Sequence, residues 1–302
     1  MSQRSCPVCE TSASQASLFL EKNFDASKLS ALSFASRKPP EFMCHRLVRC
    51  PTCDLVYVDE PLDQDVLARA YHVSDFDSAE EAADAAESYV RAIRPLLDQL
   101  PRKGRVLEIG SGTGVFLEKL EAFGFGQMVG VEPSSAAIAA APPRRRDWLR
   151  EAIFREADFE PASFDLVCCF MTMEHVRDPG LLAGAVARLL RPGGAFAIVV
   201  HDHRSWVNRL LGRRSPIIDI EHMQLFSRPA VERLFRAAGM ERPAIRSFRN
   251  RYALRYWVRL LPLPAPLRGA VDAVLRFTGL ARVKVGMNVG NMMCFAFRPG
   301  DA

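Results

Sequence analysis

The chain has 302 residues, 49% of them hydrophobic and 25% charged, and its net charge is +5. This composition is that of one or two soluble globular domains, and no apolar run reaches the ~20 residues of a transmembrane helix. The first residues lack the apolar core of a secretory signal, and the charge is low for a nucleic-acid partner. We therefore expect a cytoplasmic protein without a nucleic-acid partner.

Two CxxC pairs open and close the first 53 residues, Cys6-Pro-Val-Cys9 and Cys50-Pro-Thr-Cys53. In a chain without an export signal, such pairs indicate a metal rather than disulfides. Four thiolates from two tight turns suit one structural, tetrahedral Zn(II). Cys44 lies near the second pair and, like His45, is an alternative ligand. A redox role for the CxxC pairs is the competing interpretation.

Residues 1–60 are therefore predicted to form a small zinc-binding module. The loop from residue 10 to 49 must fold back between the two pairs, and we expect it to be helical or irregular. The apolar run Leu55 to Val58 predicts a strand that leaves the second pair. Residues 61–104 have a helical pattern and form a predicted linker or cap. The remaining cysteines, Cys168, Cys169 and Cys294, fall in predicted strands and are expected to be buried.

A glycine-rich turn follows the first strand of the main domain. The strand is predicted over 105–109 and contains Glu108, and Gly110, Gly112 and Gly114 follow it. Glycine lets a backbone turn sharply and approach a ligand closely. The next predicted strand, 128–132, ends in Glu132, where a carboxylate can accept both hydroxyls of a ribose. A dinucleotide oxidoreductase could share the turn, but it usually has a third glycine where this chain has Val115.

Strands and helices then alternate, which predicts an α/β fold with a mainly parallel sheet. Further strands are predicted at 164–170 and 195–200, with a short one near 150–157, and helices at 115–123, 134–141, 179–190 and 228–238. Late strands at 243–249 and 291–298 are expected to form the hairpin-like end of a seven-stranded sheet.

Between the late strands lies an insert, residues 250–290, with seven Arg or Lys residues against the single acid Asp272. Pro262, Pro264 and Pro266 divide it into two predicted helices. The insert could be a helical cap packed on the end of the sheet. It could also be a substrate lid, or a surface for anionic groups such as phosphates or lipid headgroups.

Several motifs recur in an order that resembles the class I S-adenosylmethionine (SAM) methyltransferases. They are VLEIGSGTG at 106–114, the acidic Glu132, FDLV at 164–167, MEHV at 173–176 and LLRPGG at 189–194. The segment from Cys50 to Pro61 is similar to a zinc-binding leader that precedes many bacterial domains of this kind. The resemblance covers about residues 85–298 and implies a Rossmann-like, seven-stranded methyltransferase domain over 105–302 that binds SAM.

The resemblance also implies how the cofactor is held. The turn 110–114, with Glu108, would face the methionine part of SAM, and Glu132 with Pro133 would face the ribose. Asp158 and Phe159 stand where the family contacts adenine, although Asp158 could equally be an acid in a surface loop. Phe170 and Met171 would lie near the reactive methyl group, because they follow the fourth strand.

Three histidines follow strands or motifs near the expected site, His175, His201 and His222. A histidine, with an ordinary pKa of ~6.5, can remove a proton from a methyl acceptor at neutral pH. Each could instead anchor a loop, and some acceptors need no base. Of the acids that bind a divalent ion in some related O-methyltransferases only Glu174 matches, so no catalytic metal is predicted.

The predicted function is SAM-dependent methyl transfer to a small-molecule acceptor in a sugar or secondary-metabolite pathway, and the arginines of the insert suggest an anionic acceptor. Two alternatives remain. One is a nucleic-acid methyltransferase, although residues 170–173 read FMTM where an NPPY- or DPPF-like tetrad would stand. The other is a SAM-binding module without catalytic activity.

Overall fold

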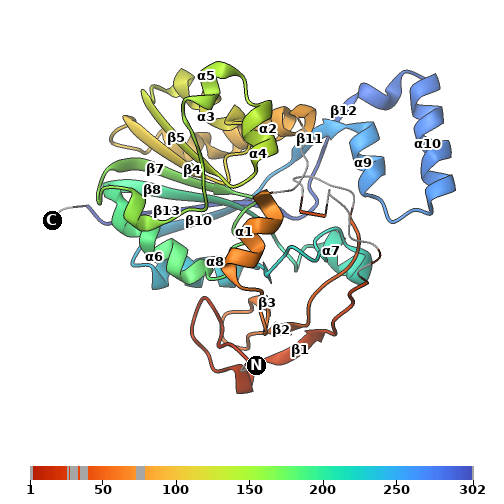
Figure 1. Cartoon of the computed structure of the whole chain (residues 1–302), viewed down its shortest axis with the longest axis horizontal. Coiled ribbons are helices and arrows are strands. Elements are labelled where there is room, and N and C mark those ends of the chain that lie inside the picture. The colour runs from red at the N-terminus through yellow and green to blue at the C-terminus, as the bar shows by residue number, and fades with distance from the viewer. Residues whose placement is uncertain (1–2, 26, 28–32, 35–39, 73–78, 301–302) are drawn as a thin grey trace.

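The structure is a computed structural model, and it describes residues 3–25, 27, 33–34, 40–72 and 79–300. One large sheet dominates it, with helices on both faces (Figure 1). Its order is β10-β13-β8-β7-β4-β5-β6. The strands are β4 (Arg105–Ile109), β5 (Gln127–Glu132), β6 (Leu149–Glu151), β7 (Phe164–Phe170), β8 (Leu190–His201), β10 (Glu241–Ser247) and β13 (Asn291–Phe297).

The pairing of these strands confirms the predicted seven-stranded methyltransferase sheet. β13 runs antiparallel to both β8 and β10, while the other five strands pair in parallel. The chain adds β5 and β6 on one side of β4 and then returns to add β7 on the other. This reversal places the carboxyl ends of β4, β5 and β7 around one crevice, where α/β sheets bind their ligands.

Alternate residues of the strands face opposite sides of the sheet and build two cores. In β4, Leu107 and Ile109 join one core while Val106 joins the other. Cys168 and Cys169 divide in the same way and are buried, and burial raises the pKa of both thiols. The apolar run of β7 is therefore the pattern of a strand covered on both faces.

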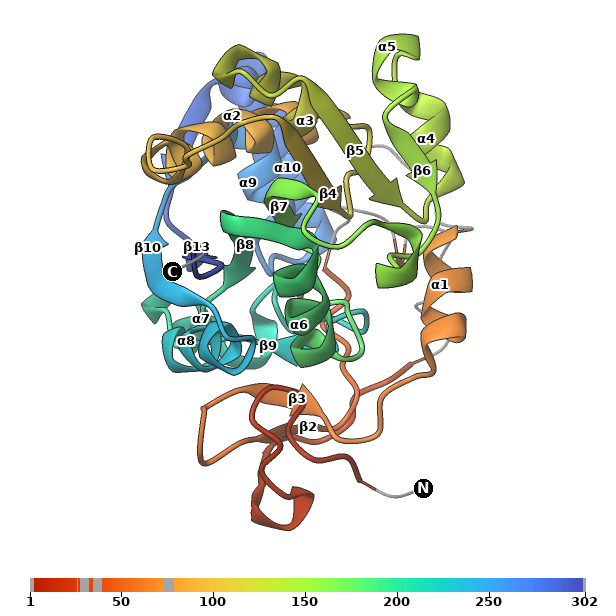
Figure 2. The same cartoon turned by 90° about the vertical axis from the view of Figure 1, so that its left-hand side faces the viewer.

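Helices α2 and α3 cover one face of the sheet, and α6 and α8 cover the other (Figure 2). The helices of the main domain and linker are α1 (Gln64–His72), α2 (Ala79–Leu97), α3 (Val115–Leu120), α4 (Ser135–Ala140), α5 (Pro143–Arg146), α6 (Pro179–Leu189), α7 (Trp206–Leu211) and α8 (Arg228–Ala237). Short 3₁₀ turns are η3 (Glu121–Phe123), η4 (Glu156–Asp158), η5 (Gly212–Arg214) and η6 (Leu280–Arg282). Helices α1 and α2 lie within the range predicted as a helical linker.

The Cys module has its own small antiparallel sheet, β1-β2-β3-β9. Its strands are β1 (Ser17–Leu20), β2 (Leu47–Arg49), β3 (Val56–Val58) and β9 (Gln224–Leu225). β3 was predicted, but the loop 10–49 is not simply helical or irregular. It holds the turn η1 (Ala13–Gln15) and two strands, because one short apolar run pairs with β3 as β2 and another pairs with β2 as β1. Parts of this loop lie outside the described residues.

The fourth strand of that sheet comes from the main domain. β9 pairs with β3 through Leu225 opposite Val56 and Gln224 opposite Tyr57. The module lies below α6 and α8 in Figure 2, on the side of the sheet away from α2.

The insert is built on a pair of strands that the sequence did not predict, β11 (Asn250–Ala253) and β12 (Lys284–Met287). Between them stand the two expected helices, α9 (Leu254–Leu260) and α10 (Ala265–Phe277). Figure 1 shows α9 beside the sheet and α10 at the outer edge of the molecule.

Candidate functional site

The glycine-rich turn after β4 has the backbone that only glycine adopts easily. Gly110, Gly112 and Gly114 have φ angles of 76°, 53° and 69°. A Cβ on Gly110 would lie 2.1 Å from Thr172 Oγ1, whereas one on Gly112 would meet nothing within 4 Å. Gly110 is therefore needed for packing, and the space over Gly112 is open to a ligand.

Glu132, at the end of β5, holds this turn in place. Its Oε2 accepts a hydrogen bond from the Gly112 N–H at 2.8 Å, and its Oε1 accepts one from the Ser134 N–H at 2.9 Å. Burial raises the pKa of Glu132, and these two N–H groups oppose that shift. Each carboxylate oxygen keeps a second lone pair, so the group can still accept hydroxyls of a bound ribose.

One cavity of about 310 Å³ begins at this turn and extends past the ends of β7 and β8 to the insert. Most of the residues predicted for the cofactor line it, namely Glu108, Gly110, Gly112, Glu132, Pro133, Phe170 and Met171. The three predicted histidines line it as well. The structure thus brings the expected cofactor and catalytic residues together around one space.

Three predicted cofactor residues do not line the cavity. Gly114 packs instead, since a Cβ there would lie 3.2 Å from a Leu149 methyl carbon. Phe159 stacks on Phe154 at 6.0 Å between ring centroids, and the Arg150 guanidinium lies over the Phe159 ring. The carbonyl of Asp158 accepts a hydrogen bond from Arg150. Contact of Asp158 and Phe159 with adenine stays a prediction.

Glu174 and His201 form a buried acid–histidine pair. The Glu174 carboxylate is fully buried, and its Oε1 accepts hydrogen bonds from His201 Nδ1 at 2.9 Å and from the His201 backbone N–H at 2.7 Å. Burial would raise the pKa of Glu174, but the charges of His201 and His222 and these hydrogen bonds lower it to about 2. An ionised carboxylate therefore fixes the orientation of the His201 ring.

His222 lies beside this pair in a defined tautomer. Its Nδ1 donates to the Ile217 carbonyl at 2.8 Å, which leaves Nε2 as the basic nitrogen. Burial lowers the pKa of His222, and the charge of His175 lowers it further. The ring of His175 lies 4.9 Å from that of His222, centroid to centroid. Burial thus favours the neutral form of His222.

Donor atoms of Glu174, His175 and His222 lie within 4.8 Å of one another, close enough to hold a cation. No catalytic metal was predicted here, because that prediction rested only on the acids close to residue 174 in the sequence. Folding adds His222 from a distant loop.

Two buried amides complete the far end of the cavity, and no motif in the sequence predicted them. Asn250 begins β11 and Asn291 begins β13, and both line the cavity. The side-chain oxygen of each is buried without a hydrogen-bond partner among the described residues. Asn291 Nδ2 also lies 3.9 Å from the sulfur of Met171, a residue with an unusual φ of 54°. Such orphaned amide oxygens are suited to receive a ligand's donors.

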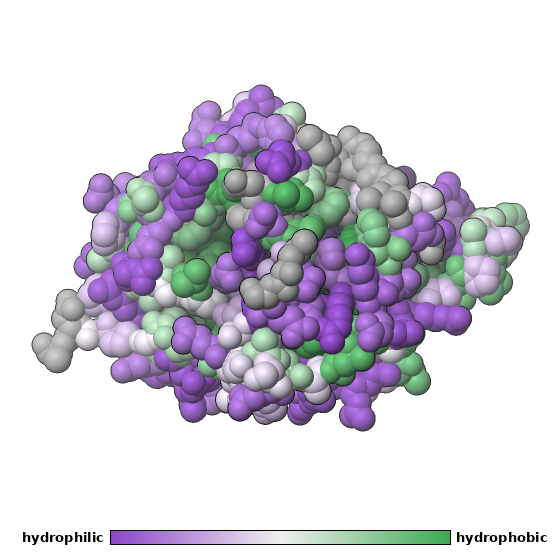
Figure 3. All heavy atoms as spheres, turned by 60° about the horizontal axis from the view of Figure 1, so that its bottom comes forward, coloured by the Kyte–Doolittle hydropathy of each residue, from purple (hydrophilic) through white to green (hydrophobic). Residues whose placement is uncertain are grey.

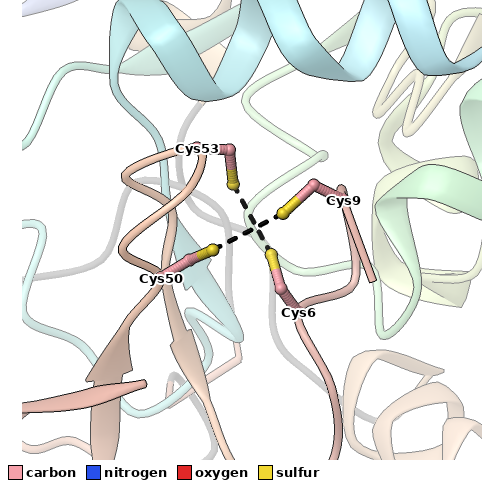
Figure 4. Close-up of side chains that lie close together, drawn as sticks. All are labelled: Cys6, Cys9, Cys50 and Cys53. Atoms are coloured by element: carbon pink, nitrogen blue, oxygen red, sulfur yellow. Dashed lines mark hydrogen bonds between the residues drawn. The ribbon is translucent and has the colours of Figure 1, made fainter. Parts of the chain in front are cut away.

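The four predicted zinc ligands converge in the Cys module (Figure 4). The sulfur atoms of Cys6 and Cys53, and those of Cys9 and Cys50, are each 3.5 Å apart, and all four lie within 4.8 Å of one another. Sulfurs around a tetrahedral zinc, with Zn–S bonds of ~2.3 Å, lie ~3.8 Å apart. This spacing fits zinc, and it is far too long for a disulfide of ~2.05 Å.

A chain of backbone hydrogen bonds connects this module to Glu174. The Val58 N–H of β3 donates to the Met223 carbonyl at 2.9 Å, and the Met223 N–H donates to the Glu174 carbonyl at 2.7 Å. Met223 directly follows His222, so the Cys module supports the loop that carries this histidine. No helix among the described residues is both long and apolar enough to cross a membrane.

Comparisons with known proteins agree with this geometry. The family described as "Methyltransferase domain" matches residues 81–242, more than half of the chain. The ubiquinone biosynthesis O-methyltransferase of Idiomarina loihiensis is 35% identical over 127 residues, which is 39% of this chain and 49% of that protein. The enzyme of the same name from Klebsiella pneumoniae subsp. pneumoniae is 30% identical over 115 residues, 36% of this chain and 48% of that protein.

The chain spans about half the length of these curated relatives. Among solved structures, a SAM-dependent methyltransferase of Thermotoga maritima is 21% identical with a TM-score of 0.48, over 72% of this chain and 91% of that one. On the family match, which includes the glycine-rich turn, Glu132 and the Glu174–His201 pair, the chain belongs to the family of SAM-dependent methyltransferase domains.

Proposed function

We propose that this chain transfers the methyl group of SAM to a hydroxyl oxygen of a small-molecule acceptor in a biosynthetic pathway. The observation that carries this proposal is the single cavity, which joins the turn at Gly112 and Glu132 to the Glu174–His201 pair. The names of the relatives, O-methyltransferases of ubiquinone biosynthesis, support an oxygen acceptor.

Bound SAM supplies an electrophilic methyl carbon, which the acceptor oxygen attacks while the sulfur leaves as a thioether. Glu132 would accept the ribose hydroxyls, and the open backbone at Gly112 would lie against the methionine part. These residues orient the donor, which matters because the displacement requires the oxygen, carbon and sulfur in line.

His201 is the proposed general base. Because Nδ1 donates to Glu174, the Nε2 of the neutral ring is the basic atom, as in other histidines oriented by a buried carboxylate. It takes the hydroxyl proton as the new bond to the methyl carbon forms, and the buried charge of Glu174 stabilises the resulting imidazolium.

The cavity favours a neutral acceptor over the anionic one that the arginines of the insert suggested. No Arg or Lys is among the described residues that line it, whereas Asp219 and Glu221 line its acceptor end. Tyr252, Tyr256 and Trp257 add an aromatic wall that suits a ring. The acceptor in this proposal can still be a sugar or a secondary metabolite.

The test is release of S-adenosylhomocysteine with a panel of phenols, catechols and sugars, for the wild type and His201→Gln. We expect turnover with a hydroxyl acceptor and a loss of about 10²–10⁴-fold in kcat for the variant, with SAM affinity unchanged. Arg236→Gln, exposed on α8 and outside the lining of the cavity, is the control. Full turnover in His201→Gln would rule out His201 as the general base. SAM binding without turnover on any acceptor would favour the non-catalytic alternative.

A further inference from the structure

Among the described helices of the main domain that are longer than ten residues, the outer helix of the insert, α10, is the least buried. It has no buried residue, and it packs on α9 and the turn η6 (Leu280–Arg282). α9, in contrast, is anchored, because Tyr256 and Trp257 are buried in the core beside α2. Figure 1 shows α10 beyond α9, at the edge of the molecule.

The side of α10 that faces away from α9 is apolar. The partly buried residues of the helix follow a helical spacing and face inward; they are Arg268, Val271, Asp272 and Leu275. The opposite side carries Leu267, Val274 and Phe277, which are 51%, 60% and 94% exposed. Leu280, just beyond the helix, is also exposed. We call these four residues the α10 patch, and hydrophobic residues are visible at this end of the molecule in Figure 3. Helices of soluble domains normally turn such a stripe toward the protein.

Unpaired positive charge accompanies the patch. Four of the seven basic residues of the insert are neutralised: Arg255, Arg259 and Lys284 pair with acids of α2, and Arg276 pairs with Asp272. Arg251, Arg268 and Arg282 form no ion pair with any residue that the structure describes. Two copies joined through this face would bring like charges together, whereas an anionic surface would neutralise them.

We propose that the α10 patch docks this protein on the surface of an anionic lipid bilayer. An interfacial helix buries an apolar face at the boundary between headgroups and acyl chains while arginines contact the phosphates. The exposed side of α10 has the apolar part of that pattern, and the exposed Arg282, two residues after Leu280, supplies the basic part.

The docking surface is connected to the cavity through α9. Tyr256, Trp257 and Leu260 line the cavity from this helix, and α10 packs on its other side. An acceptor dissolved in the bilayer would therefore reach the site across one helix. The docking itself does not depend on the proposed reaction.

The test is sedimentation of the full chain with vesicles made of equal parts phosphatidylcholine and phosphatidylglycerol, compared with phosphatidylcholine alone. We expect binding to the anionic vesicles, weakened by salt, and a loss of at least about tenfold in Val274→Glu/Phe277→Glu. Leu181→Glu/Leu210→Glu is the matched control, because both leucines are 76% exposed on other helices and the change in charge is the same. It should lose far less.

Arg282→Gln keeps the apolar face and should reduce the preference for phosphatidylglycerol. Thermal melting of each variant verifies folding, which these exposed positions should preserve. Equal binding of the α10 and control variants, or no binding of the wild type, would overturn the proposal. So would a wild-type dimer that Val274→Glu/Phe277→Glu converts to a monomer, since the patch would then cover a second copy.

Discussion

Glu132 has two tasks at once, because its carboxylate fixes the Gly112 backbone and also lines the cavity. Under the proposed role of Glu132, Glu132→Ala would remove a charge-assisted contact to the ribose of about 1.5–3 kcal/mol. We therefore expect SAM affinity to fall by about ten- to 150-fold in isothermal titration calorimetry. Glu151→Ala, at the exposed end of the neighbouring strand β6, is the control and should bind SAM normally. Unchanged affinity in Glu132→Ala would refute the assignment.

Glu174 should make folding stability depend on pH in a defined direction. Its pKa falls from 4.5 to about 2 in the folded protein, so the folded state holds fewer protons than the unfolded state between these values. Its contribution, about 3 kcal/mol, is fully present above pH 4.5 and is lost as the pH falls toward 2. The free energies of unfolding of wild type and Glu174→Gln, measured in urea, should differ less at pH 3 than at pH 5.

This comparison cancels any loss of zinc in acid, because both proteins lose it alike. Glu232→Gln, on the exposed side of α8, should match the wild type at every pH. A difference that grows as the pH falls would contradict the assignment of the charge to Glu174.

At the scale of elements, the insert divides into an anchored and an exposed half. Removing residues 252–285, as the sequence alone would suggest for a lid, would delete Tyr252, Tyr256 and Trp257 from the core. Loss of one buried aromatic residue costs about 3–5 kcal/mol, so that deletion should unfold the protein. Replacing residues 263–279 with a short Gly-Ser linker removes α10 and leaves these aromatics in place.

We expect this replacement to keep SAM affinity within about twofold and to shift Tm by only a few degrees. Calorimetry and thermal melting measure both quantities. A collapse of SAM binding together with folding would show that α10 is part of the core after all.

At the scale of the whole molecule, the Cys module supports the loop that carries His222. β3 pairs with β9, and Met223 connects this sheet to Glu174. Metal analysis should find about one zinc per chain, and Cys53→Ser should lose it and part of its stability. We expect kcat to fall more than SAM affinity, since β4 and β5 build the cofactor end independently.

Cys44→Ser is the control for this experiment, because Cys44 is buried in the same module but is not one of the four clustered thiols. It should retain zinc and turnover. Zinc loss in Cys44→Ser would show that Cys44 is a zinc ligand. Full activity in zinc-free protein would contradict the proposed dependence of turnover on the Cys module. A second metal equivalent that survives Cys53→Ser would point to Glu174, His175 and His222.

The sequence by itself determined the sheet, the glycine-rich turn with Glu132, and the cysteine pairs. Their signals are local: a buried strand, a turn that requires glycine and an acid at the next strand end all lie within thirty residues of one another. Strands β1 and β2 were missed, because runs of three or four apolar residues pair only when a partner is present.

Only the tertiary structure decided the acceptor end and the surface of the insert. Glu221 meets His175 from 46 positions away, and Asn291 reaches Met171 from 120. No local pattern relates residues so far apart, since the order of strands in the sheet brings them together. Likewise α10 has an ordinary amphipathic pattern, and only its packing on α9 shows that its apolar side faces outward.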